Sequence, residues 1–147
     1  MSDAVIGALR ANLAAMDAGL AWLDRSYGRC SAIGIKAEYT SDEFDAFENL
    51  TSRYARATDL IVNKVLRSID SAELLSSGTV IDAANRAEKR GLVDSVSRLR
   101  ELKDLRNEIS HEYETDDLAG VFAAVLAATP ELFEIGRRVN EYCARFK

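Results

Sequence analysis

Apolar residues recur every three or four positions along most of this chain, which is the spacing of an amphipathic helix. No segment alternates apolar and polar residues for long enough to indicate a β-sheet. The stretch 27–41 contains two glycines and no clear period, so we expect the first helix to end there. Before that stretch the chain carries a seam like that of a coiled coil, through Leu9, Leu13, Met16, Leu20, Leu23 and Tyr27.

Capping signals mark where the next two helices begin and end. Thr40 and Glu43 have the spacing of a capping box, which predicts a helix that continues through apolar positions to Ile69. A shorter helix is predicted over Val80–Arg90, because Gly91 can end it in the left-handed conformation.

The last part of the chain predicts two more helical regions. The first runs from about Leu92 to Tyr113. After the sequence ETDD a final helical region follows, in which Thr129 and Pro130 have the form of an N-cap and a proline at the first helical position. We therefore expect a bend or a restart of the helix there.

These signals together predict an all-α protein. We expect a single domain over residues 1–147, folded as an up-and-down bundle of four or five helices. Apolar seams lie on more helices than one core needs. A two-fold homodimer, in which some seams face a second copy of the chain, is therefore also expected.

Composition narrows the class of protein. Of the 147 residues, 48% are hydrophobic and 29% are charged, which is typical of a globular protein. No run reaches the length of uncharged apolar sequence that a membrane span requires, and the start MSDAVIGALR lacks the basic region of a signal peptide. Cys30 and Cys143 form no CxxC pattern and the chain has one histidine, so we expect no zinc site and no cofactor. Two unpatterned cysteines indicate a cytoplasmic location.

The charge is distributed unevenly. The net charge is −5, but the segment 86–106 holds seven basic and four acidic residues, so it carries +3 and the rest of the chain −8. Such a basic strip can be a solvated helix face with ion pairs, which charge alone favours, or it can hold a polyanion. Arg100 and Lys103 within it are candidate RNA-binding residues.

One arginine of this strip is predicted to lie within an apolar stripe. Leu99, Leu102, Leu105 and Ile109 share one face of a helix, and Arg106 lies inside that stripe. A charge in an apolar stripe needs a partner. Arg106 can pair with an acid of its own or another helix, extend its charge to the edge of the core, or border a cleft where it meets an anionic ligand.

The only histidine follows Arg106 on the same helix. His111 and Asn107 are four residues apart and share the flank of the stripe, whereas Tyr113 lies in the stripe. Taken alone, His111 is typical of a structural histidine and Tyr113 of a packing residue. Taken together, arginine can bind a phosphate and histidine can transfer protons near neutral pH, which suffices for metal-independent RNA cleavage. Asn107 could orient the imidazole.

The pattern Arg106-Asn107-x3-His111-x-Tyr113 resembles the motif of the HEPN superfamily, all-α domains of which many are metal-independent ribonucleases. The form R-x4-H-x-Y is similar to that of the HepT branch, the toxins of HEPN/MNT toxin–antitoxin pairs. The resemblance implies a homodimer in which Arg106 and His111 of both copies line a cleft where RNA is cut. It also implies an MNT-type nucleotidyltransferase antitoxin that transfers AMP from ATP to Tyr113.

Two other functions fit the same residues. Some HEPN domains have been regarded as non-catalytic, nucleotide- or substrate-binding partners of nucleotidyltransferases, and Arg106 and His111 would then hold a phosphate without cutting RNA. A helical dimerisation module with a structural motif is the third possibility. The sequence separates the third from the first two, but only activity separates the first from the second.

Overall fold

The computed structural model of this chain is all-helical over the residues it describes. The backbone is described for residues 2–76, 78–115 and 118–146, and the side chains for the same residues except 110–115. The all-α prediction is confirmed for this part of the chain. The elements are α1 (Asp3–Ile33), α2 (Ser41–Leu60), the π-helical segment η1 (Ile61–Val65), α3 (Leu66–Ala72), α4 (Val80–Lys89), α5 (Val96–Thr115) and α6 (Leu118–Cys143).

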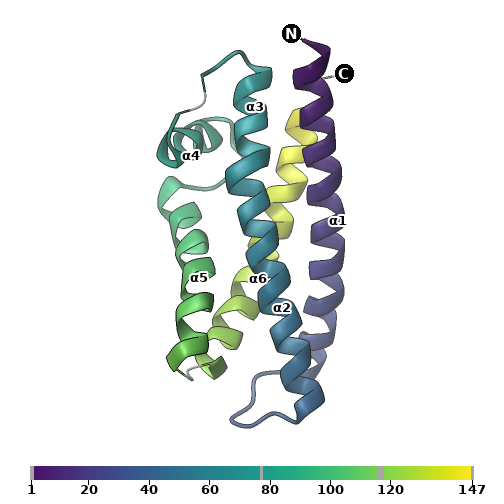
Figure 1. The fold of residues 1–147 in the computed structure, drawn as a ribbon, viewed down its shortest axis with the longest axis vertical. Helices are drawn as coiled ribbons and strands as arrows, with labels where there is room; N and C mark the ends of the chain where they lie inside the picture. Colours follow the sequence, from purple (N-terminus) through teal and green to yellow (C-terminus); the bar gives the residue numbers. More distant parts are fainter. Residues whose placement is uncertain (1, 77, 116–117, 147) are drawn as a thin grey trace.

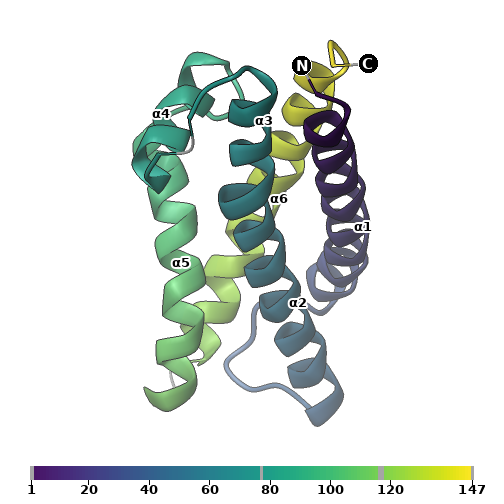
Figure 2. The ribbon, with the colours of Figure 1, turned by 45° about the horizontal axis from the view of Figure 1, so that its top comes forward.

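The long helices lie side by side and alternate in direction. In Figure 1, α1 descends, the continuous rod of α2, η1 and α3 rises, α5 descends and α6 rises, so both termini lie at the same end. The short helix α4 lies beside α3 and over the beginning of α5, as both views show (Figure 2). This is the up-and-down order expected from the sequence, while the homodimer remains a prediction.

The core runs along the axis of the bundle. Apolar side chains of α1, α2, α5 and α6 fill it, and three of the largest fully buried side chains are Phe47, Tyr54 and Phe122. Phe47 of α2 stacks on Phe122 of α6 with ring centroids 5.1 Å apart. Burying such rings contributes about 1.5–3 kcal/mol each to folding.

The predicted start of α2 and end of α4 are confirmed. Thr40 and Glu43 form the capping box, in which each side chain accepts a hydrogen bond from the backbone of the other. Gly91 has a φ of 77°, and the Leu92 N–H donates to the carbonyl of Ala87. This is the Schellman arrangement that ends a helix.

The fourth predicted helix begins later than expected. The pattern predicts a start at about Leu92, whereas α5 begins at Val96. Leu92 follows the left-handed glycine, and its N–H forms the hydrogen bond that ends α4. The side chain of Ser95 accepts from the N–H of Arg98, so a serine N-cap sets the start of α5.

The first helix ends within the stretch 27–41, as the sequence predicts. It continues through Gly28 to Ile33, and the left-handed glycine that ends it is Gly34, with a φ of 78°. The additional turns are held by tertiary contacts, because Cys30 is buried against α2 and its thiol lies 3.3 Å from the Ala46 carbonyl.

A bend or a restart is predicted at Thr129-Pro130, and the restart is wrong. α6 is one helix from Leu118 to Cys143 with Pro130 inside it. Proline removes one backbone donor and crowds the preceding turn. Thr129 is fully buried and its hydroxyl donates to the Val125 carbonyl at 2.7 Å, so it lies inside the helix and caps nothing.

The π-helical segment η1 interrupts the hydrogen-bond spacing of the long rod without bending the chain away. Across it the Leu66 N–H donates to the Ile61 carbonyl, five residues back. π-turns of this kind are rare and often lie near functional sites.

Among the residues that the structure describes, two helices, α1 and α6, are long and apolar enough, by length and composition alone, to cross a membrane. The expectation that no segment approaches this length was therefore too strict, because a span tolerates one or two charged residues. Core helices of globular proteins pass the same test, and α6 packs against α1 and α2. The cytoplasmic location stays a prediction.

Candidate functional site

Arg106 pairs with an acid from another helix. Its Nε atom lies 2.9 and 3.1 Å from the two carboxylate oxygens of Asp59, near the end of α2. This was the first of the three explanations offered for an arginine in an apolar stripe. The side chains are 29% and 42% exposed, so the pair is solvent-screened and contributes at most about 1 kcal/mol to stability.

The contact with Asp59 uses only one of the three guanidinium nitrogens. In the hydrogen bonds that Arg106 makes with residues whose side chains the structure describes, Nε is the donor. Asp59 therefore holds the guanidinium in place, while a guanidinium can also bind an anion through its terminal nitrogens.

The helix α5 is fixed on the same side by a second contact from α2. The Tyr54 hydroxyl donates to the Leu102 carbonyl at 2.9 Å, and both residues are buried. Burial raises the pKa of Tyr54 far above its ordinary value, so the phenol stays protonated and remains a donor. The contacts of Tyr54 and Asp59 thus fix the position of α5 along α2 and its rotation about its own axis.

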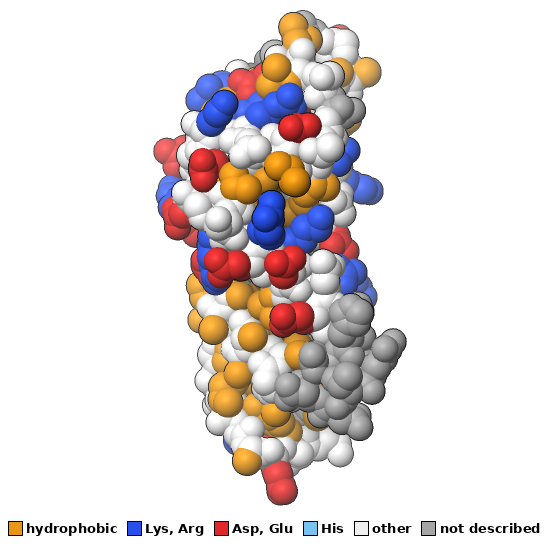
Figure 3. Space-filling view, turned by 90° about the vertical axis from the view of Figure 1, so that its left-hand side faces the viewer, with side chains coloured by type: hydrophobic (Ala, Val, Ile, Leu, Met, Phe, Trp, Pro, Cys, Tyr) orange, Lys and Arg blue, Asp and Glu red, His pale blue; other side chains and the backbone are white. Residues whose placement is uncertain are grey.

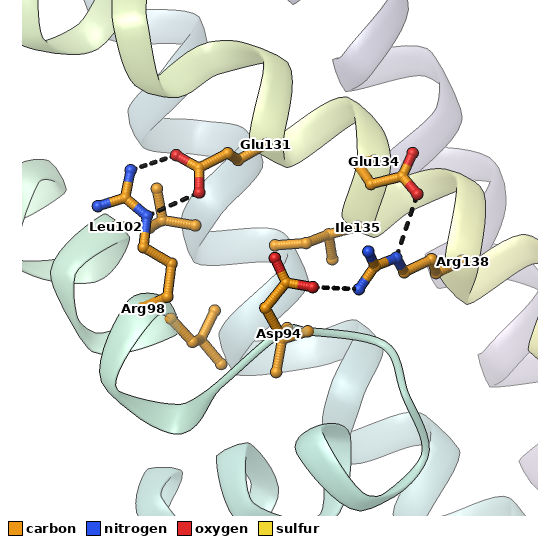
Figure 4. Close-up of a pocket in the computed structure, with 9 residues that line it drawn as sticks. Asp94, Arg98, Leu102, Glu131, Glu134, Ile135 and Arg138 are labelled. Carbon is orange, nitrogen blue, oxygen red and sulfur yellow. Dashed lines mark hydrogen bonds and ion pairs between the residues drawn. The ribbon is translucent and has the colours of Figure 1, made fainter.

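The helix α6 also holds α5 in place. Arg98 forms a two-point ion pair with Glu131, and Arg138 of α6 pairs with Asp94, in the loop before α5, at 2.9 Å (Figure 4). Hydrogen bonding to Glu131 raises the pKa of Arg98. The space between the two pairs is about 40 Å³, little more than one water molecule, so this is an anchoring contact.

Two further arginines of the basic strip form ion pairs that stabilise the fold. Arg86 of α4 and Arg90, the residue after α4, both contact the buried carboxylate of Asp70, at 3.1 and 2.7 Å. Arg90 also contacts Glu73 at 2.7 Å. For Arg86, Arg90 and Arg98, the interpretation of the strip as a helix face with ion pairs is therefore correct.

The remaining strip residues of α5 line a hollow between α4 and α5. The predicted RNA-binding residues Arg100 and Lys103 and the supporting residue Asn107 lie along it, together with Asp104. The hollow has a volume of about 310 Å³. Figure 3 faces this side of the molecule and shows apolar side chains bordered by Lys and Arg.

The hollow has an apolar floor built from three elements. Residues far apart in the sequence form it: Val62 of η1, Val80, Ile81 and Ala84 of α4, and Val96 and Leu99 of α5. Ile81, which is 54% exposed, adds apolar surface to the hollow. The charge pattern and the motif gave no indication that α4 contributes to this hollow. The sequence feature that could have indicated it is Ile81, an isoleucine on the helix face that is not buried in the core.

The predicted motif residues are only partly described. Arg106 and Asn107 are adjacent on α5, but their side chains lie in different surroundings. Arg106 contacts Asp59, whereas Asn107 lines the hollow. His111 and Tyr113 lie on the helical backbone of α5, and His111 follows Asn107 by about one turn. The side chains of both lie outside the described residues.

No group of three His, Cys, Asp or Glu side chains that could hold a metal ion occurs among the residues searched, which are those described. Both cysteines are free and buried, and burial raises the pKa of each thiol to about 11. Neither thiol is therefore a nucleophile near neutral pH.

The comparisons with known proteins return no neighbour. No family model, no curated protein and no solved structure matches this chain. The assignment to the HEPN superfamily accordingly rests on the motif of α5 and remains a prediction.

Proposed function

We propose that this protein is a metal-independent endoribonuclease toxin of the HEPN/MNT type, active as a two-fold homodimer. One observation carries the proposal. The outer guanidinium nitrogens of Arg106, the open cations Arg100 and Lys103, and the backbone of His111 all belong to one helix, α5.

Each residue has a part in the proposed reaction. One His111 takes the proton of an RNA 2′-hydroxyl, whose oxygen attacks the neighbouring phosphorus. The bond from phosphorus to the 5′ oxygen breaks, and the His111 of the second copy returns a proton to that oxygen. Arg106 stabilises the additional negative charge, and the products are a 2′,3′-cyclic phosphate and a 5′-hydroxyl end.

A dimer resolves a geometric difficulty of this scheme. Residues five apart on a helix point about 140° away from each other, so Arg106 and His111 of one copy cannot easily reach one phosphate. A two-fold axis beside α5 brings two sets of these residues together. AMP carried by Tyr113 would place negative charge where the RNA phosphate binds, which explains neutralisation by a nucleotidyltransferase.

Cleavage of single-stranded RNA in the presence of EDTA tests the proposal. We expect His111→Ala and Arg106→Ala each to lower the rate at least about 100-fold, with fold and dimer preserved. Arg137→Ala is the matched control, since that exposed arginine pairs with Glu134 and Glu141 and should leave the rate unchanged. A fully active His111→Ala protein rules out the catalytic assignment.

The regulatory part has a separate test. Intact mass and peptide mapping after incubation with a candidate nucleotidyltransferase and ATP should show whole AMP units on the Tyr113 peptide. Cells that express Tyr113→Phe together with the antitoxin should remain inhibited. Normal rescue of that variant means that the antitoxin acts by binding alone or at another residue.

A second candidate function is a non-catalytic nucleotide-binding subunit of a nucleotidyltransferase. The observation that favours it is the occupied Nε atom of Arg106, because Asp59 brings a negative charge close to the proposed scissile phosphate. Binding through Arg100 and Lys103 needs no such chemistry. A stable complex with the transferase, without AMP transfer and without RNA cleavage, would favour this function.

A further inference from the structure

The hollow between α4 and α5 has a chemistry that phosphate binding does not require. Cations alone hold a polyanion, yet six apolar residues line this hollow, and one of them, Ile81, is half exposed. An apolar surface beside open cations matches a nucleotide, which has one flat, largely apolar face and one charged end.

The cations at the rim are placed for the charged end. Arg100 and Lys103 lie three residues apart on α5 and so on neighbouring positions of one helix face. Neither forms an ion pair with a residue that the structure describes, in contrast to Arg98 one turn earlier. Their positive charge is therefore available to phosphates on either side of a bound base.

Two polar residues at the rim supply hydrogen bonds that can discriminate between bases. Asp104 is exposed, and a carboxylate accepts hydrogen bonds but donates none. It therefore favours the exocyclic amino group of adenine, cytosine or guanine and repels the two carbonyl oxygens of uracil. Asn107 offers both a donor and an acceptor, as adenine recognition requires.

We propose that the α4–α5 hollow binds one base of the single-stranded RNA substrate, prefers a base with an exocyclic amino group over uracil, and holds the adjoining phosphates with Arg100 and Lys103. This inference rests on the proposed ribonuclease function and names its substrate preference. Asn107 lines the hollow, Arg106 is its neighbour and His111 lies one turn further along α5. The bound base therefore lies on the same helix as the proposed catalytic residues.

Fluorescence anisotropy with labelled eight-nucleotide oligo-A, oligo-C and oligo-U tests this, in a His111→Ala protein that cannot consume the RNA. We expect oligo-A and oligo-C to bind about fivefold more tightly than oligo-U. Ile81→Ser should weaken the binding of oligo-A and oligo-C about threefold. Ile35→Ser is the matched control, the same substitution at a residue of equal exposure, 54%, outside the hollow, and should change nothing.

A third variant tests the base preference separately from the overall affinity for RNA. Asp104→Asn keeps the shape of the side chain but removes its charge and adds a donor. We expect it to bind all three oligonucleotides at least as tightly as before, while the preference for A and C over U falls below about twofold. An unchanged preference in this variant contradicts the role given to Asp104.

The outcomes separate this inference from the proposed function. Equal affinity for A, C and U, or no effect of Ile81→Ser, overturns the base site, and cleavage by the wild-type protein would then still support the ribonuclease. Selective binding that depends on Ile81 and Asp104, without cleavage by the wild-type protein, supports the base site and overturns the ribonuclease. Absence of RNA binding overturns both.

Discussion

Basic residues at the two ends of one strip behave in opposite ways. At one end, Arg86 and Arg90 converge on Asp70, whose side chain is 1% exposed, and Arg90 itself is 8% exposed. At the other end, Arg100 and Lys103 face the α4–α5 hollow without an ion pair to a described residue. The first end stabilises the fold, whereas the second is open to a ligand.

The difference comes from the neighbouring helix, not from the arginines themselves. Burial alone would lower the pKa of Arg90, but its hydrogen bond to Asp70 and the nearby Glu73 raise it. α3 supplies these two acids to α4, while the floor of the hollow beside Arg100 is apolar. Amino-acid composition does not distinguish the two groups of basic residues, although only Arg100 and Lys103 can bind an external anion.

The largest expected effect is on stability at the first end. Asp70→Asn leaves two arginines without their buried counter-charge, and we expect the free energy of unfolding to fall by about 3 kcal/mol. Urea denaturation followed by circular dichroism measures it. Glu141→Gln, which breaks the exposed pair with Arg137, is the control and should change stability by less than about 0.5 kcal/mol. A loss below 1 kcal/mol for Asp70→Asn would contradict the comparison.

The second end should affect RNA affinity and leave stability unchanged. Arg100→Gln with Lys103→Gln removes two open cations, so we expect about tenfold weaker RNA binding and a smaller dependence on salt concentration. The double variant Arg137→Gln and Arg138→Gln makes the same change in net charge at carboxylate-paired positions. If it weakens RNA binding equally, general charge and not the hollow determines affinity.

The pair of Asp59 with Arg106 is intermediate between the buried pairs of Asp70 and the cations of the hollow. This pair is partly exposed, so Asp59→Asn should change the free energy of unfolding by less than about 1 kcal/mol. Removing its negative charge should strengthen RNA binding about threefold, because Arg106 then carries an uncompensated positive charge. Weaker binding in this variant would mean that Asp59 is needed to position Arg106.

The smallest effect concerns exposed ion pairs outside both ends. Hydrogen bonds from Arg137 and Arg138 lower the pKa of Glu134 to about 2. Figure 4 shows the bond from Arg138. A pKa lowered by folding stabilises the protein above the unfolded-state pKa, and this contribution is lost as the pH falls toward 2. Urea denaturation at pH 7, 4 and 2.5 should show a smaller acid-induced loss for Glu134→Gln than for the wild type. Identical pH profiles would assign the acid sensitivity to other carboxylates.

The sequence predicted the features that depend on neighbours a few residues away. The capping box of Thr40 and Glu43 and the left-handed Gly91 are local, and both are present. The continuity of α6 through Pro130 was not predicted, because Thr129 is fixed by packing between helices.

The same distinction applies to the candidate site. That Arg106 pairs with an acid was among the expected explanations, but Asp59 is 47 positions away and could not be identified from the pattern. The hollow joins η1, α4 and α5, so its floor becomes visible only when these elements are packed together. Periodicity describes one helix at a time, and a site between helices needs their arrangement.

The π-turn of η1 also limits how this chain can change over evolutionary time. It gives the rod of α2, η1 and α3 one residue more than a regular α-helix would hold in that turn. Because each helical residue advances about 100° around the axis, the faces before and after η1 have different phases. Asp59, before it, meets α5, and Asp70, after it, meets α4. Deletion of a single residue such as Asn63 could leave the helix intact yet turn one of these carboxylates away, so selection acts here on the number of residues as well as on their identity.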